Sequence, residues 1–349
     1  MTCSLYKTNR HTKMKVVVDN KIPYIRETIE RIADEVVYLP GKEIDADAIK
    51  DADAIIIRTR TICNESLLKG SKVRFIGTAT IGFDHIDTEY CKKAGITWRN
   101  CPGCNAGAVE QYVHAILLLL QKEKNIQLSN LCLGIIGVGH VGSHILSMAG
   151  RLGMRILLND PPREDRGENG FVSLDTIADK CNIITFHTPL IKDGKYKTEH
   201  LADDRFFNKL KNKPIIINTS RGEVINTKAI LKAIDNGKIS EAIIDVWENE
   251  PNINTELLNK VFIGTPHIAG YSANGKINAT RMTLESLCSF FNINTKIEIS
   301  LPPDPNAPYS SDENIRILEQ YNPHNDYNAL LKNPEKFEQM RGNYNLRRE

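Results

Sequence analysis

Three residues able to act together on a hydroxy acid follow successive apolar segments in the second half of the chain. Arg221 follows PIIIN, Glu250 follows EAIIDV and His267 follows VFIGT. Histidine titrates near neutral pH and can accept a hydroxyl proton. A carboxylate beside it fixes its tautomer, and arginine offers a planar fork that grips a carboxylate at two points. The set indicates hydride transfer from a 2-hydroxy acid to a nicotinamide cofactor.

Each of these residues also has a purely structural interpretation. An arginine can cap a helix, Glu250 stands before Pro251 in a turn, and a histidine can simply be buried. Together they favour chemistry, because the carboxyl ends of parallel strands meet at one edge of a sheet, where ligands bind. We therefore expect Arg221, Glu250 and His267 to form the catalytic group.

A glycine-rich motif, GVGHVG, occupies residues 137–142, after an apolar strand and at the start of a helix. Gly137 permits a tight turn, Gly139 lets the backbone approach a pyrophosphate, and Gly142 allows close packing of helix on sheet. The amides at the helix N-terminus then face the phosphates. The predicted cofactor-binding residues of this region are Gly137, Gly139, His140, Val141, Gly142 and Asp160.

Asp160 stands 21 residues after Gly139, at the end of the next apolar strand. An acidic residue there accepts hydrogen bonds from the ribose hydroxyls and repels a 2′-phosphate, so it favours NAD over NADP. Arg163 lies close in sequence and could weaken that preference. The structural alternative is a turn residue before Pro161.

The elements that must position these residues alternate strand and helix, which predicts parallel sheets. In the first part we expect a helix over 22–35 and strands at 15–19, 54–58, 74–78 and 97–99. A long apolar helix begins near Asn105, and a helix over 274–291 leads back to the first part. Between them, six strands at 131–136, 154–159, 182–187, 214–218, 241–246 and 261–265 predict a doubly wound parallel sheet of the Rossmann type.

Composition limits the class of protein. The chain has 349 residues, 41% hydrophobic and 25% charged, with a net charge of +2, so it argues against a nucleic-acid or membrane-surface binder. Residues 1–15 carry no apolar core of a secretory signal, and eight scattered cysteines are typical of reduced thiols. We expect a cytoplasmic protein. The pair Cys101 and Cys104 has no second pair to complete a metal site, so no metal is predicted.

The segments GVGHVG, TSRGEVIN, DVWENEP and PHIAGY resemble those of the D-isomer-specific 2-hydroxyacid dehydrogenases. The resemblance implies an NAD-binding domain inserted into a flavodoxin-like α/β substrate domain, with the active site in a cleft. It also implies that Arg221 binds substrate, that His267 is the acid/base and that Glu250 is its partner. The cofactor contacts that it adds are Thr188, Asp245 and Gly270.

Further segments, among them GTATIGFDHID, NDPPREDRG and RGNYNLRRE, resemble one branch of this family. Its members oxidise 4-phospho-D-erythronate with NAD on the route to pyridoxal phosphate. This implies substrate contacts at Thr59, Thr80 and Tyr271 and a homodimer. The implied organisation is an extension at 1–13, a substrate-binding domain at 14–104 and 268–300, an NAD-binding domain at 105–267, and a C-terminal dimerisation unit at 301–349.

Other functions stay open from the sequence. One is a sister dehydrogenase that acts on 3-phosphoglycerate or an unphosphorylated hydroxy acid, and another is an NAD-sensing interaction protein of the same fold. A phosphorylated substrate needs cations or backbone amides. Arg58 and Arg60 are candidates within the chain, and Arg347 and Arg348 could reach across a dimer.

Overall fold

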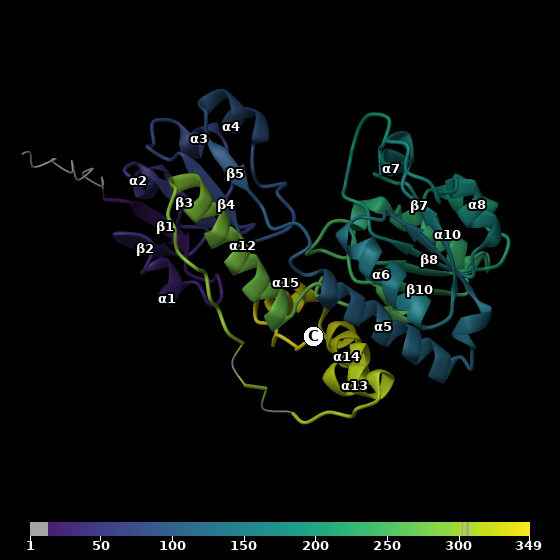
Figure 1. Ribbon diagram of the computed structural model, residues 1–349. Coiled ribbons are helices and arrows are strands. Elements are labelled where there is room, and N and C mark those ends of the chain that lie inside the picture. The colour runs from purple at the N-terminus through teal and green to yellow at the C-terminus, as the bar shows by residue number, and fades with distance from the viewer. Residues whose placement is uncertain (1–12, 302, 305–306) are drawn as a thin grey trace, which may run out of the picture. The chain divides into compact units, whose positions relative to one another are not determined.

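The computed structural model describes residues 13–301, 303–304 and 307–349 (Figure 1). The predicted extension at 1–13 therefore lies outside the described residues except for Lys13. The chain forms two compact units. Unit 1 comprises Met1–Cys104 with Lys276–Pro302, and unit 2 comprises Asn105–Gly275 with Pro303–Glu349.

Unit 1 holds a sheet of five parallel strands in the order β2-β1-β3-β4-β5. This order is that of a flavodoxin-like sheet and confirms the fold expected for this part. The strands are β1 (Lys15–Asp19), β2 (Glu35–Leu39), β3 (Ala54–Ile57), β4 (Phe75–Thr78) and β5 (Thr97–Arg99). The helices are α1 (Arg26–Ile29), α2 (Ala46–Ile49), α3 (Glu65–Leu68), α4 (Thr88–Ala94) and, from Lys276 onward, α12 (Ala273–Phe291).

The helix predicted over 22–35 is wrong for most of its length. Only the four residues of α1 are helical, and β2 begins at Glu35. The segment EVVYL is rich in β-branched and aromatic residues, which suit a pleated surface, and it pairs with the whole of β1. Asp34, directly before β2, is held beside the start of β1, because its carboxylate accepts a hydrogen bond from the amide of Met14 over 2.8 Å.

Unit 2 holds six parallel strands in the order β7-β6-β8-β9-β10-β11. All six predicted strands are confirmed, as is the doubly wound sheet. The direction of the strand order reverses at β6, and ligands of such sheets bind beyond the carboxyl ends at that point. The strands are β6 (Cys132–Ile136), β7 (Arg155–Asn159), β8 (Ile183–Phe186), β9 (Ile215–Asn218), β10 (Glu241–Ile244) and β11 (Ile263–Gly264).

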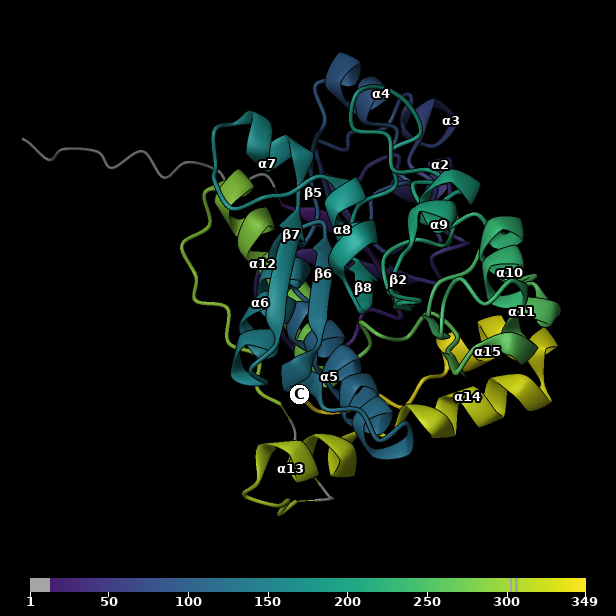
Figure 2. The ribbon, with the colours of Figure 1, turned by 90° about the vertical axis from the view of Figure 1, so that its right-hand side faces the viewer.

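Helices cover both faces of this sheet (Figure 2). One face packs against α5 (Ala106–Glu123) and α6 (His140–Arg151). The other packs against α8 (Leu174–Lys180), α9 (Asp204–Lys209), α10 (Thr227–Asp235) and α11 (Thr255–Lys260). Shorter elements are α7 (Pro161–Asp165), η1 (Leu128–Asn130) and η2 (Gly222–Val224). With both faces buried, the strands read as continuous apolar runs.

The C-terminal segment packs on unit 2 through α13 (Glu313–Gln320), α14 (Pro323–Lys332), η3 (Pro334–Lys336) and α15 (Phe337–Gly342). Leu330 and Phe337 are fully buried in the core on one face of the sheet, and Tyr321 is buried in the core on the other. The segment is therefore part of the body of unit 2. Its predicted role in dimerisation stays a prediction.

Of the helices in the described ranges, none combines the length and the apolar character needed to cross a bilayer.

Candidate active site

His267 stands just beyond β11, in a loop whose backbone is tightly held. Its φ of 58° lies in the left-handed region, which is costly for a residue other than glycine unless the surroundings enforce it. Its amide donates to the carbonyl oxygens of Thr265 and Asp245 over 3.0 and 2.8 Å. The loop thus fixes the direction in which the imidazole points.

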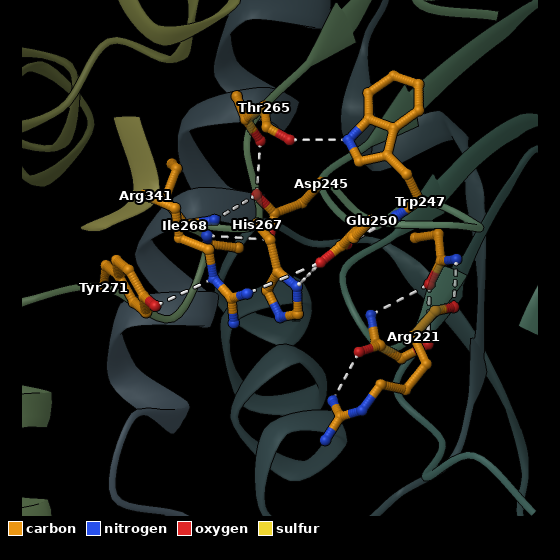
Figure 3. Close-up of polar contacts among 12 residues, drawn as sticks. Arg221, Asp245, Trp247, Glu250, Thr265, His267, Ile268, Tyr271 and Arg341 are labelled. Atoms are coloured by element: carbon orange, nitrogen blue, oxygen red, sulfur yellow. Dashed lines mark hydrogen bonds and ion pairs between the residues drawn. The ribbon is translucent and has the colours of Figure 1, made fainter. Parts of the chain in front are cut away.

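The imidazole of His267 is paired with Glu250. Nδ1 lies 2.8 Å from Oε2 of the carboxylate, and the two side chains are 25% and 19% exposed (Figure 3). A carboxylate can only accept, so Nδ1 carries a proton, and in the neutral imidazole Nε2 then keeps its lone pair. The arrangement presents Nε2 as a proton acceptor.

Glu250 is held as an anion. Burial by itself would raise the pKa of its carboxyl, but His267, the amide of Trp247 and Arg341 together outweigh burial, so the pKa lies below its usual value. The amide of Trp247 donates to Oε1 over 2.9 Å, and Arg341 adds a positive charge 3.9 Å from Oε2. Both carboxylate oxygens therefore have partners that favour the ionised form.

Arg221 follows β9 at the same edge of the sheet and directly precedes η2. Its Nη1 donates to the carbonyl oxygen of Ser220 over 2.8 Å, and its own carbonyl accepts from the side chain of Asn218 over 2.9 Å. The helical turn that follows it is packed closely, since a Cβ on Gly222 would lie 2.0 Å from the carbonyl carbon of Trp247. Figure 3 draws the guanidinium of Arg221 below the imidazole of His267.

Asp245 is buried just beyond β10 and anchors the loop of His267. One oxygen accepts from the hydroxyl of Thr265 over 2.6 Å and from the amide of Ile268 over 2.8 Å, and the other accepts from the amide of Ala269 over 3.0 Å. Burial raises the pKa of its carboxyl. The bonds show a structural role, and its predicted contact with the cofactor stays a prediction.

The glycine motif has the shape of a phosphate cradle. Gly137 has a φ of 86°, and a Cβ on Gly142 would lie 2.1 Å from the carbonyl oxygen of Gly137. Gly139 is exposed, and a Cβ on it would meet no described atom within 4 Å. His140 and Val141 begin α6 directly behind it. Space above the turn and amides facing it suit a pyrophosphate.

Two further residues fit a dinucleotide. A Cβ on Gly137 would lie 2.9 Å from Cγ2 of Thr188, so the turn lies against the end of β8. The hydroxyl of Thr188 is buried and has no hydrogen-bond partner in the described chain. A buried hydroxyl is normally paired, so this one is suited to a hydrogen bond with a ligand. Asp160 accepts from the amide of Val138 over 2.8 Å, which places its carboxylate at the turn. The residues present therefore fit NAD.

Arg163 does not lie unpaired beside Asp160. Its Nε donates to Glu168 over 2.8 Å, and its Nη1 donates to the carbonyl oxygen of Val138 over 2.8 Å. Neutralised in this way, it offers little attraction for a 2′-phosphate, and the preference for NAD over NADP is supported.

The remaining predicted site residues have these positions. Thr59 and Thr80 lie in unit 1, each two residues after the neighbouring strands β3 and β4, and Thr59 is exposed. The hydroxyl of Thr80 donates to the carbonyl oxygen of Gly82 over 2.9 Å. In unit 2, Gly270 fits closely, since a Cβ there would lie 2.1 Å from Nδ2 of Asn105. The substrate contacts predicted for Thr59, Thr80 and Tyr271 stay predictions.

Two arginines of the C-terminal segment contact the site region. Arg341, which the sequence did not single out, donates from Nε to the hydroxyl of Tyr271 over 3.1 Å. Arg347 is buried and donates to the carbonyl oxygens of Ile268 and Tyr271 over 3.0 and 2.8 Å. The idea that Arg347 reaches across a dimer is wrong, because its donors are used within its own chain.

The candidate phosphate cation Arg58 is likewise engaged. Its Nε lies 3.1 Å from the fully buried carboxylate of Asp19, at the end of the neighbouring strand β1. The sequence pattern does not predict the pair of Arg58 and Asp19 or the contacts of Arg341 and Arg347, because each joins residues far apart in the chain.

Residues 109–269 match the family model of the D-isomer-specific 2-hydroxyacid dehydrogenases, NAD-binding domain. The chain is 59% identical over 339 residues to the erythronate-4-phosphate dehydrogenase of Bacteroides thetaiotaomicron, which covers 96% of this chain and 97% of that protein. It is 46% identical over 278 residues to the erythronate-4-phosphate dehydrogenase of Escherichia coli strain ATCC 8739, which covers 79% of this chain and 73% of that protein. The chain belongs to the erythronate-4-phosphate dehydrogenase family.

Solved structures of sister dehydrogenases share the fold of this family. The NAD⁺-bound 3-phosphoglycerate dehydrogenase of Entamoeba histolytica matches with a TM-score of 0.69 and 28% identity, over 83% of this chain and all of that one. The D-lactate dehydrogenase of Aquifex aeolicus, complexed with NAD and lactic acid, matches with a TM-score of 0.66 and 26% identity, over 80% of this chain and 95% of that one. The predicted family, fold class and NAD cofactor are confirmed.

Proposed function

We propose that this chain oxidises 4-phospho-D-erythronate to 2-oxo-3-hydroxy-4-phosphobutanoate with NAD, in the biosynthesis of pyridoxal phosphate. The observation that carries the chemistry is the 2.8 Å pair of His267 and Glu250 at the carboxyl edge of the NAD-binding sheet. The substrate is supported by the names of relatives that are 59% and 46% identical.

In the proposed reaction His267 is the catalytic base. Its Nε2 takes the proton from the hydroxyl on C2 of the substrate, and Glu250 stabilises the imidazolium that forms because it is already ionised. Arg221 binds the substrate carboxylate through its planar fork and orients C2. NAD, held by the residues of the glycine motif, would supply the acceptor for the hydride on C2. In the opposite direction His267 returns the proton to the oxo oxygen.

The residues of the glycine motif hold the cofactor in this proposal. The amides around Gly139 bind the pyrophosphate, Asp160 accepts from the ribose hydroxyls, and the buried hydroxyl of Thr188 gains a partner. Asp245 and Gly270 shape the backbone beside His267, where the nicotinamide has to lie for hydride transfer.

The appearance of NADH with a panel of acids tests the substrate. We expect turnover with 4-phospho-D-erythronate and little with D-3-phosphoglycerate or D-lactate. Turnover with 3-phosphoglycerate instead would favour a sister dehydrogenase. The structural match to the 3-phosphoglycerate dehydrogenase of Entamoeba histolytica is the observation that supports this alternative. Binding of NADH without turnover of any acid would favour an NAD-sensing protein.

Replacement of His267 by alanine tests the proton transfer. We expect kcat to fall about 10²- to 10⁴-fold while NADH still binds. His324 offers a matched control, because it forms a similar pair with Glu123 over 2.7 Å on α14 and α5. The variant His324→Ala should keep its kcat. Wild-type activity in His267→Ala would refute the assignment.

A homodimer and a cytoplasmic location complete the proposal. The resemblance to the family supports the dimer, and light scattering after gel filtration measures it. All seven cysteines of the described chain are free thiols, as expected in a reducing compartment.

A further inference from the structure

Arg341 brings a second guanidinium to the proposed active site. It lies on α15, a short helix that the fully buried ring of Phe337 anchors in the core of unit 2. Its Nε donates to the hydroxyl of Tyr271 over 3.1 Å, and its Nη1 lies 3.9 Å from Oε2 of Glu250. Figure 3 shows its guanidinium beside the imidazole of His267.

Most of the donors of Arg341 are not used within the described chain. A guanidinium has five N–H groups, and the bond from Nε to Tyr271 is the one hydrogen bond that this guanidinium makes to a described residue. The 3.9 Å to Glu250 is longer than a hydrogen bond. The side chain is 22% exposed, so it is accessible to a ligand.

The two arginines lie on different sides of the imidazole in Figure 3, with Arg341 beside the ring and Arg221 below it. The proposed substrate carries an anion at each end of its four-carbon chain, a carboxylate on C1 and a phosphate on C4. With C2 held at His267 and the carboxylate on Arg221, the phosphate has to leave the reacting carbon in another direction. A dianion that is removed from water needs a cation and further donors there.

We propose that Arg341, together with the hydroxyl of Tyr271, binds the phosphate of the substrate. This inference rests on the proposed function and adds to it the residue that distinguishes phosphorylated from unphosphorylated hydroxy acids. Arg341 fixes Tyr271 through Nε, and its Nη1 and Nη2 face the phosphate oxygens. Arginine suits this position because its fork can donate two parallel hydrogen bonds to one phosphate.

A second role is open to Arg341, and the two roles predict different results. Its charge also favours the ionised form of Glu250, so it could act through the His267 pair alone. In that case its loss would slow every substrate by the same factor. If Arg341 binds the phosphate, its loss affects only substrates that carry one.

The test compares 4-phospho-D-erythronate with D-erythronate as substrates of the wild type, Arg341→Ala and Lys336→Ala. For Arg341→Ala we expect kcat/KM for the phosphorylated acid to fall about 10- to 100-fold, mainly through KM, as for the loss of hydrogen bonds to a charged group. For D-erythronate the value should change less than about threefold. Lys336 is an exposed cation just before α15, and its variant should match the wild type.

Competitive inhibition by inorganic phosphate gives a second measurement that does not depend on slow turnover of D-erythronate. The inhibition constant should rise about tenfold or more in Arg341→Ala and stay unchanged in Lys336→Ala. NADH binding and the melting temperature show whether each variant is folded. The variant Arg341→Lys keeps the charge, so its inhibition constant for phosphate should lie between those of the wild type and Arg341→Ala.

An equal loss for both acids, or no loss for either, overturns the role of Arg341. Absence of turnover of 4-phospho-D-erythronate by the wild type overturns the proposed function itself, so the two failures are distinguishable.

Discussion

Replacing Arg347 by alanine should destabilise unit 2 and loosen the loop that follows His267. The guanidinium is buried, and the ring of Tyr321 stacks on it with a centroid distance of 4.3 Å. Its five hydrogen bonds go to Oε1 of Gln111 and to the carbonyl oxygens of Ala108, Ile268, Ala269 and Tyr271. Three of these carbonyls belong to the four residues after His267, so the arginine holds the backbone that positions the base.

The magnitude follows from the acceptors that the change leaves behind. The carbonyl of Ile268 keeps the amide of Tyr271 as a donor over 2.8 Å, and that of Ala108, in the first turn of α5, keeps its helical donor. Three acceptors are left without a donor at about 1–3 kcal/mol each, so the loss is about 3–9 kcal/mol. Removing a buried charge recovers part of this, because the charge no longer has to be desolvated. We expect a net loss of about 3–5 kcal/mol, which lowers Tm by roughly 6–20 °C for a unit of this size.

Thermal unfolding followed by circular dichroism measures the change, with Lys336→Ala as the control for loss of a positive charge from the same segment. The Tm of Arg347→Lys should lie between those of the wild type and Arg347→Ala, since an ammonium has three donors in place of five. We also expect kcat to drop about tenfold or more, because a small displacement of a catalytic group is costly. A Tm within about 2 °C of the wild type would refute this account of the Arg347 bonds.

Three further predictions concern the site. Glu250→Gln should lower kcat and move the acid limb of the kcat/KM profile to lower pH, because the imidazole loses its anionic partner. The pKa of the Glu250 carboxyl in the folded protein is below the ordinary value of 4.5. The ionised carboxylate therefore stabilises the fold above pH 4.5, and this stabilisation is lost as the pH falls through the folded pKa. Urea titrations should show that acid destabilises Glu250→Gln less than the wild type. Gly139→Ala should fold normally yet lose NADH binding, measured by fluorescence, whereas Gly142→Ala should lower Tm because its Cβ would meet the carbonyl oxygen of Gly137 at 2.1 Å. Asp160→Gly should reduce the ratio of kcat/KM with NAD to that with NADP, and an unchanged ratio would contradict the ribose contact.

The sequence by itself determined the fold class, the cofactor and the family. Short β-branched runs such as PIIIN favour strands buried on both faces, and GVGHVG after such a run indicates a dinucleotide turn. The expectation that Glu250 and His267 meet also came from the sequence, since both follow strands that end at one edge of the sheet, and the structure brings them to 2.8 Å.

The local sequence pattern was not enough to predict secondary structure where the pairing of two strands determined it. The segment 22–35 has residues that tolerate a helix, but β2 forms because it pairs with β1 along five residues. That pairing is a long-range contact, and intrinsic propensity is too weak to oppose it.

Only the tertiary structure showed what the C-terminal segment does in unit 2. Arg341 and Arg347 stand 74 and 80 residues after His267 in the sequence, and nothing in their spacing links them to it. They lie near His267 because Leu330 and Phe337 are buried in the core of unit 2 and so fix the position of α15 and the residues after it. Burial of apolar side chains fixes the path of the chain, and the polar contacts follow from that path.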